Sequence, residues 1–171
     1  MTLSFRPLSL LALLWALTLP AQAQGALEQA QSHWYAGRQA EAVNTLEAAL
    51  TAQPRDAKLR FALAWMRQEQ GQTGSAEQLL RSLIEEFPDH SEAQNNLAVI
   101  LAQRGDLDAA QQLLERAVQL HPEHWQAQEN LGDLLLRLAQ RAYLRAAQSP
   151  APGGVQLKLK LLEPLLRAPQ R

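Results

Sequence analysis

The chain repeats a pattern of residues every 34 positions, and this period constrains its fold more than any other feature. Four columns of residues share the period: Gly37, Gly71 and Gly105; Pro54, Pro88 and Pro122; Ala42, Ala76 and Ala110; Leu46, Leu80 and Leu114. Four independent columns with one spacing indicate a tandem array of one structural unit.

Each column has a physical reason that points to helices. Glycine just past a helix end can adopt the left-handed conformation that terminates the helix. Proline fits the first turn of a helix and pushes the residue before it out of the helical region. Between Gly105 and Pro122 the apolar residues recur at helical spacing, as in Leu107, Ala110 and Leu114. Each unit is therefore predicted to be two antiparallel helices joined by a tight turn.

A 34-residue helix-turn-helix unit of this kind resembles the tetratricopeptide repeat, whose signature is W-x2-L-G-x2-Y, then A-x3-F, then P. The third unit shows Leu97-Ala98-x2-Leu101, Ala110-x3-Leu114 and Pro122, and a fourth opens with Leu131-Gly132-x2-Leu135. The tryptophan column is absent, because Ala26, Arg60, Gln94 and Gln128 stand there. The resemblance implies an all-α, right-handed tetratricopeptide-type alpha solenoid of about 3.5 repeats, with a long C-terminal capping helix. The repeat domain is expected over residues 24–148, with repeats at about 23–56, 57–90 and 91–124 and a partial one at 125–148.

The first 23 residues have the layout of a secretory signal peptide. One basic residue, Arg6, precedes an apolar run from Leu8 to Leu19, and Ala21-Gln22-Ala23 forms the cleavage site. The apolar run is shorter than the roughly 20 residues that span a bilayer. We therefore expect export by a cleavable leader, with residence in the periplasm and full secretion as the alternative.

Composition narrows the class of partner. The chain has no cysteine, which excludes disulfides and the lipid attachment of bacterial lipoproteins. Removing residues 1–23 takes Arg6 from the 16 basic residues and none of the 17 acidic ones, so the net charge becomes −2. Without a basic excess, nucleic acid and an anionic membrane surface are not the expected partners. After cleavage, no integral membrane anchor is expected either.

The C-terminal part departs from the repeat. No turn residue follows the start of the fourth unit, so residues 124–148 are predicted to be one continuous helix, with a shortened two-helix repeat turning near Ala139 as the alternative. Residues 149–154, SPAPGG, are a Pro/Gly linker. Residues 155–171 alternate like a strand and also carry leucines at helical spacing. A lone strand has no partner in a helical array, so a capping helix or tail, interrupted or ended by Pro164, is the expectation.

The sequence contains no recognisable catalytic arrangement. It has no nucleophile elbow, no HExxH and no phosphate-binding loop. His121 and His124 have the spacing of metal ligands, with His90 one repeat earlier, but a zinc site needs more ligands in a fixed geometry. We therefore expect no enzyme, no metal site and no cofactor.

The resemblance implies a binding surface instead, because in this family the first helix of each unit lines a concave groove. Registering the units on one another gives these groove residues: Trp34, Lys58, Phe61, Trp65, Asn95, Asn96, Val99, Glu129, Asn130 and Asp133. Asn96 and Asn130 are 34 residues apart, and in peptide-binding members an asparagine there holds the ligand backbone. Trp34, Phe61 and Trp65 would anchor apolar side chains. The alternatives are that the tryptophans belong to the core between repeats and that the asparagines bond a neighbouring helix.

The sequence thus favours a periplasmic adaptor that binds a peptide or helix of a cell-envelope protein in its groove. "NNLA" at 95–98 and "ENLGD" at 129–133 also resemble small exported tetratricopeptide proteins of Gram-negative bacteria. The alternative is a structural, homo-oligomerising protein whose C-terminal leucines pair copies and whose groove is filled by its own tail.

Overall fold

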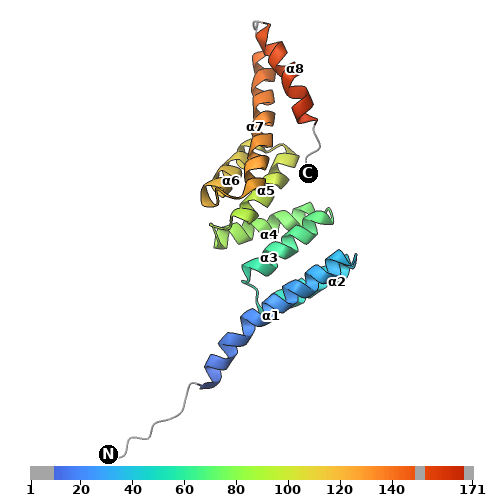
Figure 1. The fold of residues 1–171 in the computed structure, drawn as a ribbon, viewed down its shortest axis with the longest axis vertical. Helices are drawn as coiled ribbons and strands as arrows, with labels where there is room; N and C mark the ends of the chain where they lie inside the picture. The colour runs from blue at the N-terminus through green and yellow to red at the C-terminus, as the bar shows by residue number, and fades with distance from the viewer. Residues whose placement is uncertain (1–9, 149–152, 168–171) are drawn as a thin grey trace, which may run out of the picture. The chain divides into compact units, whose positions relative to one another are not determined.

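The computed structural model describes residues 10–148 and 153–167, and within these ranges every regular element is a helix (Figure 1). The chain divides into two compact units, residues 1–83 and 84–171. The all-α fold predicted from the 34-residue period is confirmed. Residues 1–9 of the expected leader, residues 149–152 of the linker and residues 168–171 of the tail lie outside the described residues. Cleavage after Ala23 stays a prediction.

The first unit contains three helices and most of a fourth. Helices α1 (Leu10–Tyr35) and α2 (Gln39–Ala52) pack side by side, and α3 (Ala57–Glu69) packs against both. Helix α4 (Thr73–Glu86) follows α3, and the Arg60 guanidinium of α3 donates to Ser82 Oγ of α4 at 2.9 Å. The core of the unit contains Ala30, Ala42, Leu46, Leu59, Leu63 and Met66. Ala42 and Leu46, which the repeat pattern marked as packing positions, are fully buried.

The turns inside the repeats follow the glycine column. Gly37, Gly71 and Gly105 have φ of 77°, 73° and 97°, and the chain has no other glycine with positive φ among the described residues. At Gly105, the Gly105 N–H donates to Ala102 and the Asp106 N–H donates back to Leu101. The same pair of bonds occurs at the other two glycines, and together they form the Schellman end of a helix. The predicted left-handed role of these glycines is confirmed.

We expect Gly105→Ala to lower the free energy of unfolding by about 1–2 kcal/mol, because a Cβ is strained at a left-handed residue. Gly74 provides the control, since it lies inside α4 with open space around the position of a Cβ. Gly74→Ala should raise the free energy of unfolding by about 0.5–1 kcal/mol. Urea unfolding followed by circular dichroism measures both, and equal effects of the two substitutions would contradict the assignment.

The second unit is built around α5 (Ser91–Arg104), α6 (Leu107–Leu120) and α7 (Trp125–Ala146). Helix α5 packs on α6, α6 packs on α7, and α5 also contacts α7. Ala98, Ala110 and Leu114 are buried between these helices. The small alanines let the helices approach closely, and the leucine fills the space beside them.

The turns between repeats are fastened by glutamines at the position where the signature expects tryptophan. Gln94 Nε2 donates to the carbonyl oxygen of Pro88 at 2.7 Å, and Gln128 Nε2 donates in the same way to Pro122. The two bonds are related by the 34-residue period. In the third and fourth repeats, a carboxamide thus satisfies a turn carbonyl that lies beside the start of the helix.

The C-terminal elements are both helices. Helix α7 has 22 residues and no turn near Ala139, so the segment is one helix. Helix α8 (Gly154–Leu166) returns along α7 and contains Pro164 in its last turn (Figure 1). The helix prediction for this segment is correct, and Pro164 lies close to the helix end without stopping it at once. Lys158 Nζ lies 5.3 Å from the centre of the Tyr143 ring of α7. Helix α8 therefore packs on the C-terminal half of α7.

Candidate functional site

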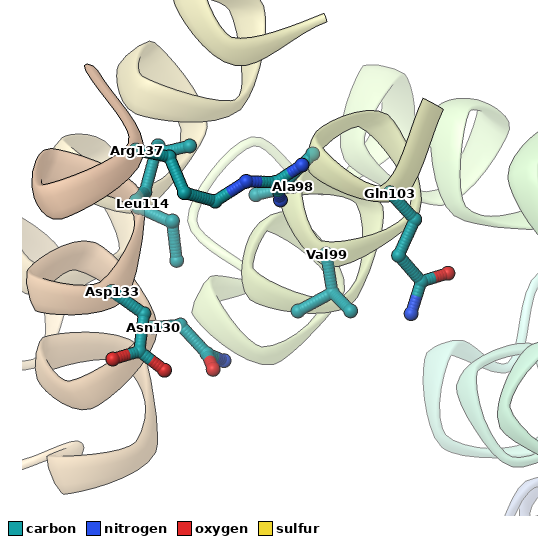
Figure 2. A pocket seen from close by; sticks show the side chains of 9 residues that line it. Ala98, Val99, Gln103, Leu114, Asn130, Asp133 and Arg137 are labelled. Atoms are coloured by element: carbon teal, nitrogen blue, oxygen red, sulfur yellow. The ribbon is translucent and has the colours of Figure 1, made fainter. Parts of the chain in front are cut away.

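Helices α5 and α7 form a small pocket in the second unit. The polar and aliphatic lining includes Val99 and Gln103 on α5 and Asn130, Asp133 and Arg137 on α7 (Figure 2). The floor is apolar and consists of Ala98, Val99, Ala102, Leu114 and Leu134. The volume is about 50 Å³. Three of the residues predicted from sequence, Val99, Asn130 and Asp133, therefore line one pocket.

The asparagines of α5 and α7 are joined by hydrogen bonds. Asn130 Nδ2 donates to Asn95 Oδ1 at 2.9 Å, and Asn95 Nδ2 donates to Asn96 Oδ1 at 3.2 Å. Asn95 is buried in the middle of this row, whereas Asn96 and Asn130 are half-buried at its ends. The row links the first helices of two successive repeats, so each amide is held in place by its neighbour.

The two ends of the asparagine row are open for a ligand. Neither Asn130 Oδ1 nor an Nδ2 hydrogen of Asn96 has a hydrogen-bond partner within the described part of the chain. One end therefore offers an acceptor for a peptide N–H, and the other offers a donor for a peptide carbonyl. The alternative for these asparagines was a hydrogen bond to a neighbouring helix. Asn130 makes such a bond to Asn95, and its Oδ1 can still accept a hydrogen bond from a ligand.

Besides the apolar floor, two polar pocket residues were not among the sequence-based candidates. Gln103 lies one helical turn after Val99, and Arg137 lies one turn after Asp133. Figure 2 shows the Arg137 side chain reaching from α7 toward α5. The spacing of four residues was the signal that could have found both, because residues i and i+4 share a helix face. The groove predicted from the repeats is therefore one helical turn too short in these two repeats.

In the first unit, two of the predicted residues are in contact with each other. The rings of Trp34 on α1 and Trp65 on α3 are 5.2 Å apart between centroids and tilted by 55°. Both are half-buried and pack against the apolar core of the unit. Phe61, half-buried, lies one turn before Trp65, and Lys58 is exposed at the start of α3. The tryptophans thus contribute to packing between repeats while keeping part of their surface exposed.

Glu129 is exposed on α7 beside Asn130 and does not line the pocket. The single groove expected to unite Trp34, Phe61 and Trp65 with the asparagines stays a prediction. The described tail residues, 154–167, contribute nothing to the lining of the α5–α7 pocket.

Among the basic residues that follow the pocket along α7, Arg141 pairs with an acidic residue of the same chain. The guanidinium of Arg141 donates two hydrogen bonds to Asp108 on α6, at 2.9 and 2.5 Å. These bonds, together with the charges of Arg141 and Arg145, hold the pKa of Asp108 below its ordinary value of 3.8. The same pairing raises the pKa of Arg141. This fork-shaped pair links α7 to α6.

We expect the contribution of the Asp108–Arg141 pair to stability to disappear in acid. A carboxylate whose pKa is lowered in the folded state stabilises the fold above its unfolded pKa, here about 3.8. That contribution is lost as the pH falls through the still lower folded pKa. The free energies of unfolding of wild type and Asp108→Asn, measured in urea, should therefore differ at pH 6, and the difference should be lost as the pH falls below 3.8 and through the lower folded pKa. A difference that stays the same over this pH range would contradict the assignment.

The first turn of α5 holds a second acid with an altered pKa. Burial raises the pKa of Glu92, but its own backbone N–H, the charge of His90 and the Ser91 hydroxyl together lower the pKa below 4.5. His90 Nδ1 also accepts the N–H of Ala93 at 3.3 Å, so the imidazole caps the helix. This turn is polar and structural, and it gives α5 a fixed start.

Neither a metal site nor a membrane-spanning helix is found within the described residues. No group of three or more potential metal ligands occurs there. His121 Nδ1 lies 3.2 Å from a Glu123 oxygen, a contact between neighbours in the chain. Among the described helices, none combines the length and the apolar character required to cross a bilayer.

Comparison with known proteins gives the following findings. A family profile described as tetratricopeptide repeat matches residues 33–100 and 67–128. No curated protein sequence matches the chain. Among solved structures, the first TPR of Spaghetti (RPAP3), bound to the HSP90 peptide SRMEEVD, is 18% identical, with a TM-score of 0.64, and the match covers 70% of this chain and 94% of that one.

Two bacterial structures are also similar. The Yersinia enterocolitica type III secretion chaperone SycD, in complex with a peptide of the translocator YopD, is 18% identical, with a TM-score of 0.60 and coverage of 67% and 92%. The Pseudomonas aeruginosa protein PilF is 22% identical, with a TM-score of 0.65 and coverage of 88% and 71%. At these identities the likeness shows the fold alone.

Proposed function

Because the chain belongs to the tetratricopeptide-repeat family, we propose that it is a non-catalytic scaffold that binds a peptide segment of another protein. The segment lies along α5 and α7, with its backbone on Asn96 and Asn130 and one side chain in the α5–α7 pocket. The observation that carries the proposal is the asparagine row. Its two open ends offer one hydrogen-bond acceptor and one donor to a ligand.

The dimensions of the pocket support a peptide over a small-molecule substrate. Drug-sized ligands and substrates occupy sites of about 300–1,000 Å³, whereas this pocket has about 50 Å³. Such a volume accepts one small apolar side chain against Val99 and Leu134. Asp133 and Arg137 at the rim then select for polar groups on either side of it. Two of the similar solved structures, RPAP3 and SycD, hold peptides of other proteins, which agrees with this use of the fold.

The expected leader supports a place for the scaffold beyond the inner membrane. The proposed partner is then a protein of the cell envelope, and the location is the periplasm. The mass of the purified protein after expression of the whole gene tests this directly. We expect the chain to begin at Gln24 and to be recovered in the periplasmic fraction, whereas retention of residues 1–23 would contradict export by a cleaved leader.

The binding test begins with a photo-crosslinking amino acid at Gln103, an exposed residue of the pocket rim. The same amino acid at Gln119, exposed on α6, is the control. Proteins captured in living cells at position 103 and not at 119 are identified by mass spectrometry. The crosslinked segment is then synthesised as a peptide, and its dissociation constant is measured by fluorescence anisotropy.

Two arginine variants on the same helix test whether that peptide uses the pocket. Arg137→Ala removes a lining residue, and Arg145→Ala removes the same side chain two turns away, outside the pocket. We expect the dissociation constant to rise about tenfold for Arg137→Ala and to stay within about twofold for Arg145→Ala. Equal effects of the two substitutions would place the peptide elsewhere and contradict the proposal.

A further inference from the structure

One face of the first helix is buried in the third repeat, but the equivalent face in the fourth repeat is exposed. In the third repeat, Leu97, Ala98 and Leu101 on α5 are almost fully buried, with Leu101 only 2% exposed. Their equivalents 34 residues later are half-buried or exposed, and Leu135 is 45% exposed. A Cβ built on Gly132 would meet nothing within 4 Å. We call Gln128, Leu131, Gly132 and Leu135 the open α7 face.

The reason for the open face lies in how the chain continues. After α5 the chain turns at Gly105 and α6 packs back on it. Helix α7 instead runs on to Ala146, and α8 packs on its C-terminal half, near Tyr143. The expectation that the C-terminal segment covers the open end of the array is thus met only along that half. The open α7 face keeps the pattern that accepts a second repeat helix, but no described helix occupies it.

A second apolar face lies on α8. Leu157, Leu161 and Leu165 are 58%, 63% and 56% exposed and follow one another at intervals of four, so they form one stripe. The other apolar side of the helix, which includes Val155, Leu159 and Leu162, is half-buried. Helix α8 is therefore apolar on two sides, as expected of a helix packed between two neighbours. We call the three exposed leucines the α8 stripe.

We propose that the protein forms a two-fold dimer in which the α8 stripe of each copy covers the open α7 face of the other. One interface then accounts for both exposed apolar faces. It is isologous, because the same pair of surfaces meets twice and the assembly closes. In this dimer the partner's α8 takes the place on α7 that α6 holds on α5.

Charge supports this pairing over a pairing of like helices. In the N-terminal half of α7, up to Leu136, Glu129 lies one turn before Gly132 of the open α7 face, and no Lys or Arg is present there. Helix α8 and its C-cap carry Lys158, Lys160 and Arg167 against a single acid, Glu163, and so have a net charge of +2. An α7–α8 contact between copies brings opposite charges together, whereas an α8–α8 contact brings like charges together.

The area also favours a reciprocal contact. Helix α8 has 13 residues, so one of its faces is about 20 Å long and about 10 Å wide. That is small beside the roughly 1,200–2,000 Å² that stable interfaces bury. A two-fold pair buries four such faces at once, two from each copy, or about 800 Å². A single α7–α8 contact would bury only half of that area, so the reciprocal contact is the more stable of the two arrangements.

The surface is separate from the proposed peptide site. Leu135 is two residues from both Asp133 and Arg137, which places it on the opposite side of α7 from the pocket. Dimerisation therefore leaves the α5–α7 pocket accessible, and each dimer presents two pockets.

The test uses sedimentation velocity on protein purified after expression of the whole gene, over a range of concentrations. Wild type is expected to sediment as a dimer, and Leu135→Glu and Leu161→Lys are each expected to raise the dimer dissociation constant about tenfold or more. Leu144→Glu is the matched control, because Leu144 is 51% exposed on the opposite side of α7. It should leave the dimer intact.

Mixing the two disrupted variants identifies which surfaces meet. In a heterodimer of Leu135→Glu with Leu161→Lys, one contact pairs the new Glu with the new Lys, and the other contact is wild type. Sedimentation of the mixture should therefore recover the dimer, which also shows that both variants are folded. A monomeric wild type would overturn the proposal and assign the open α7 face to a helix of another protein. Variants that still dimerise, or a mixture that stays monomeric, would overturn the α7–α8 pairing.

Discussion

Leu46→Ala is expected to lower the free energy of unfolding by about 3 kcal/mol, the largest effect on stability of any substitution considered. Leu46 has no exposed surface and lies in the core of the first unit between α1, α2 and α3. Truncation removes buried apolar atoms and leaves a cavity that the surrounding helices fill only in part, and such changes cost about 2–5 kcal/mol. Urea unfolding followed by circular dichroism measures the loss.

Leu50→Ala is the matched control, because Leu50 lies one turn later on α2 and is only partly buried against the same core. We expect it to cost less than half as much as Leu46→Ala, since less apolar surface is re-exposed to water and the site can be filled by solvent. If the two substitutions destabilised the protein equally, the leucine column of the repeat would not be the centre of the packing.

Asn96→Ala combined with Asn130→Ala is expected to weaken binding of the identified peptide by at least about tenfold. The double variant removes both open ends of the asparagine row, and with them a donor and an acceptor for the peptide backbone. The free energy of unfolding should fall by about 1–2 kcal/mol, because buried Asn95 loses its bonds to both neighbours. Fluorescence anisotropy gives the affinity, and thermal unfolding gives the stability.

Asn44→Ala is the control for this pair, because Asn44 is exposed on α2 in the other unit. It should change neither affinity nor stability. A double variant that lost several kcal/mol of stability along with binding would show that the asparagine row is chiefly a structural contact between α5 and α7. A double variant with unchanged affinity would remove the asparagines from the peptide site.

Much of the fold follows from local chemistry that is visible in the sequence. Gly105 ends its helix because a glycine tolerates a φ of 97°, and nothing distant is needed to arrange that. Ala110 and Leu114 are buried because helical spacing puts them on the face that meets the next helix. The same residue types recur at 34-residue intervals. A weak helix or turn signal in one repeat is therefore supported by the equivalent residues in the others.

The candidate site was predictable only in part. Registering the repeats placed Val99, Asn130 and Asp133 together, and the structure confirms that they line one pocket. Arg137 and Gln103 were missed although they share the same faces. The bond from Asn130 to Asn95 could not be foreseen, because the choice between solvent, ligand and neighbouring helix depends on how closely α5 and α7 approach.

The sequence by itself determined the helices, their ends and the residues that pack inside each repeat, because these depend on backbone preferences and on periodicity within about 34 residues. Only the tertiary structure decided where α8 packs, that Arg141 is held by Asp108, and that the open α7 face stays uncovered. The physical reason is that both sides of α8 are apolar. A helix that is apolar on two sides can pack against two neighbouring helices. Its sequence does not show which of these helices belongs to the same chain.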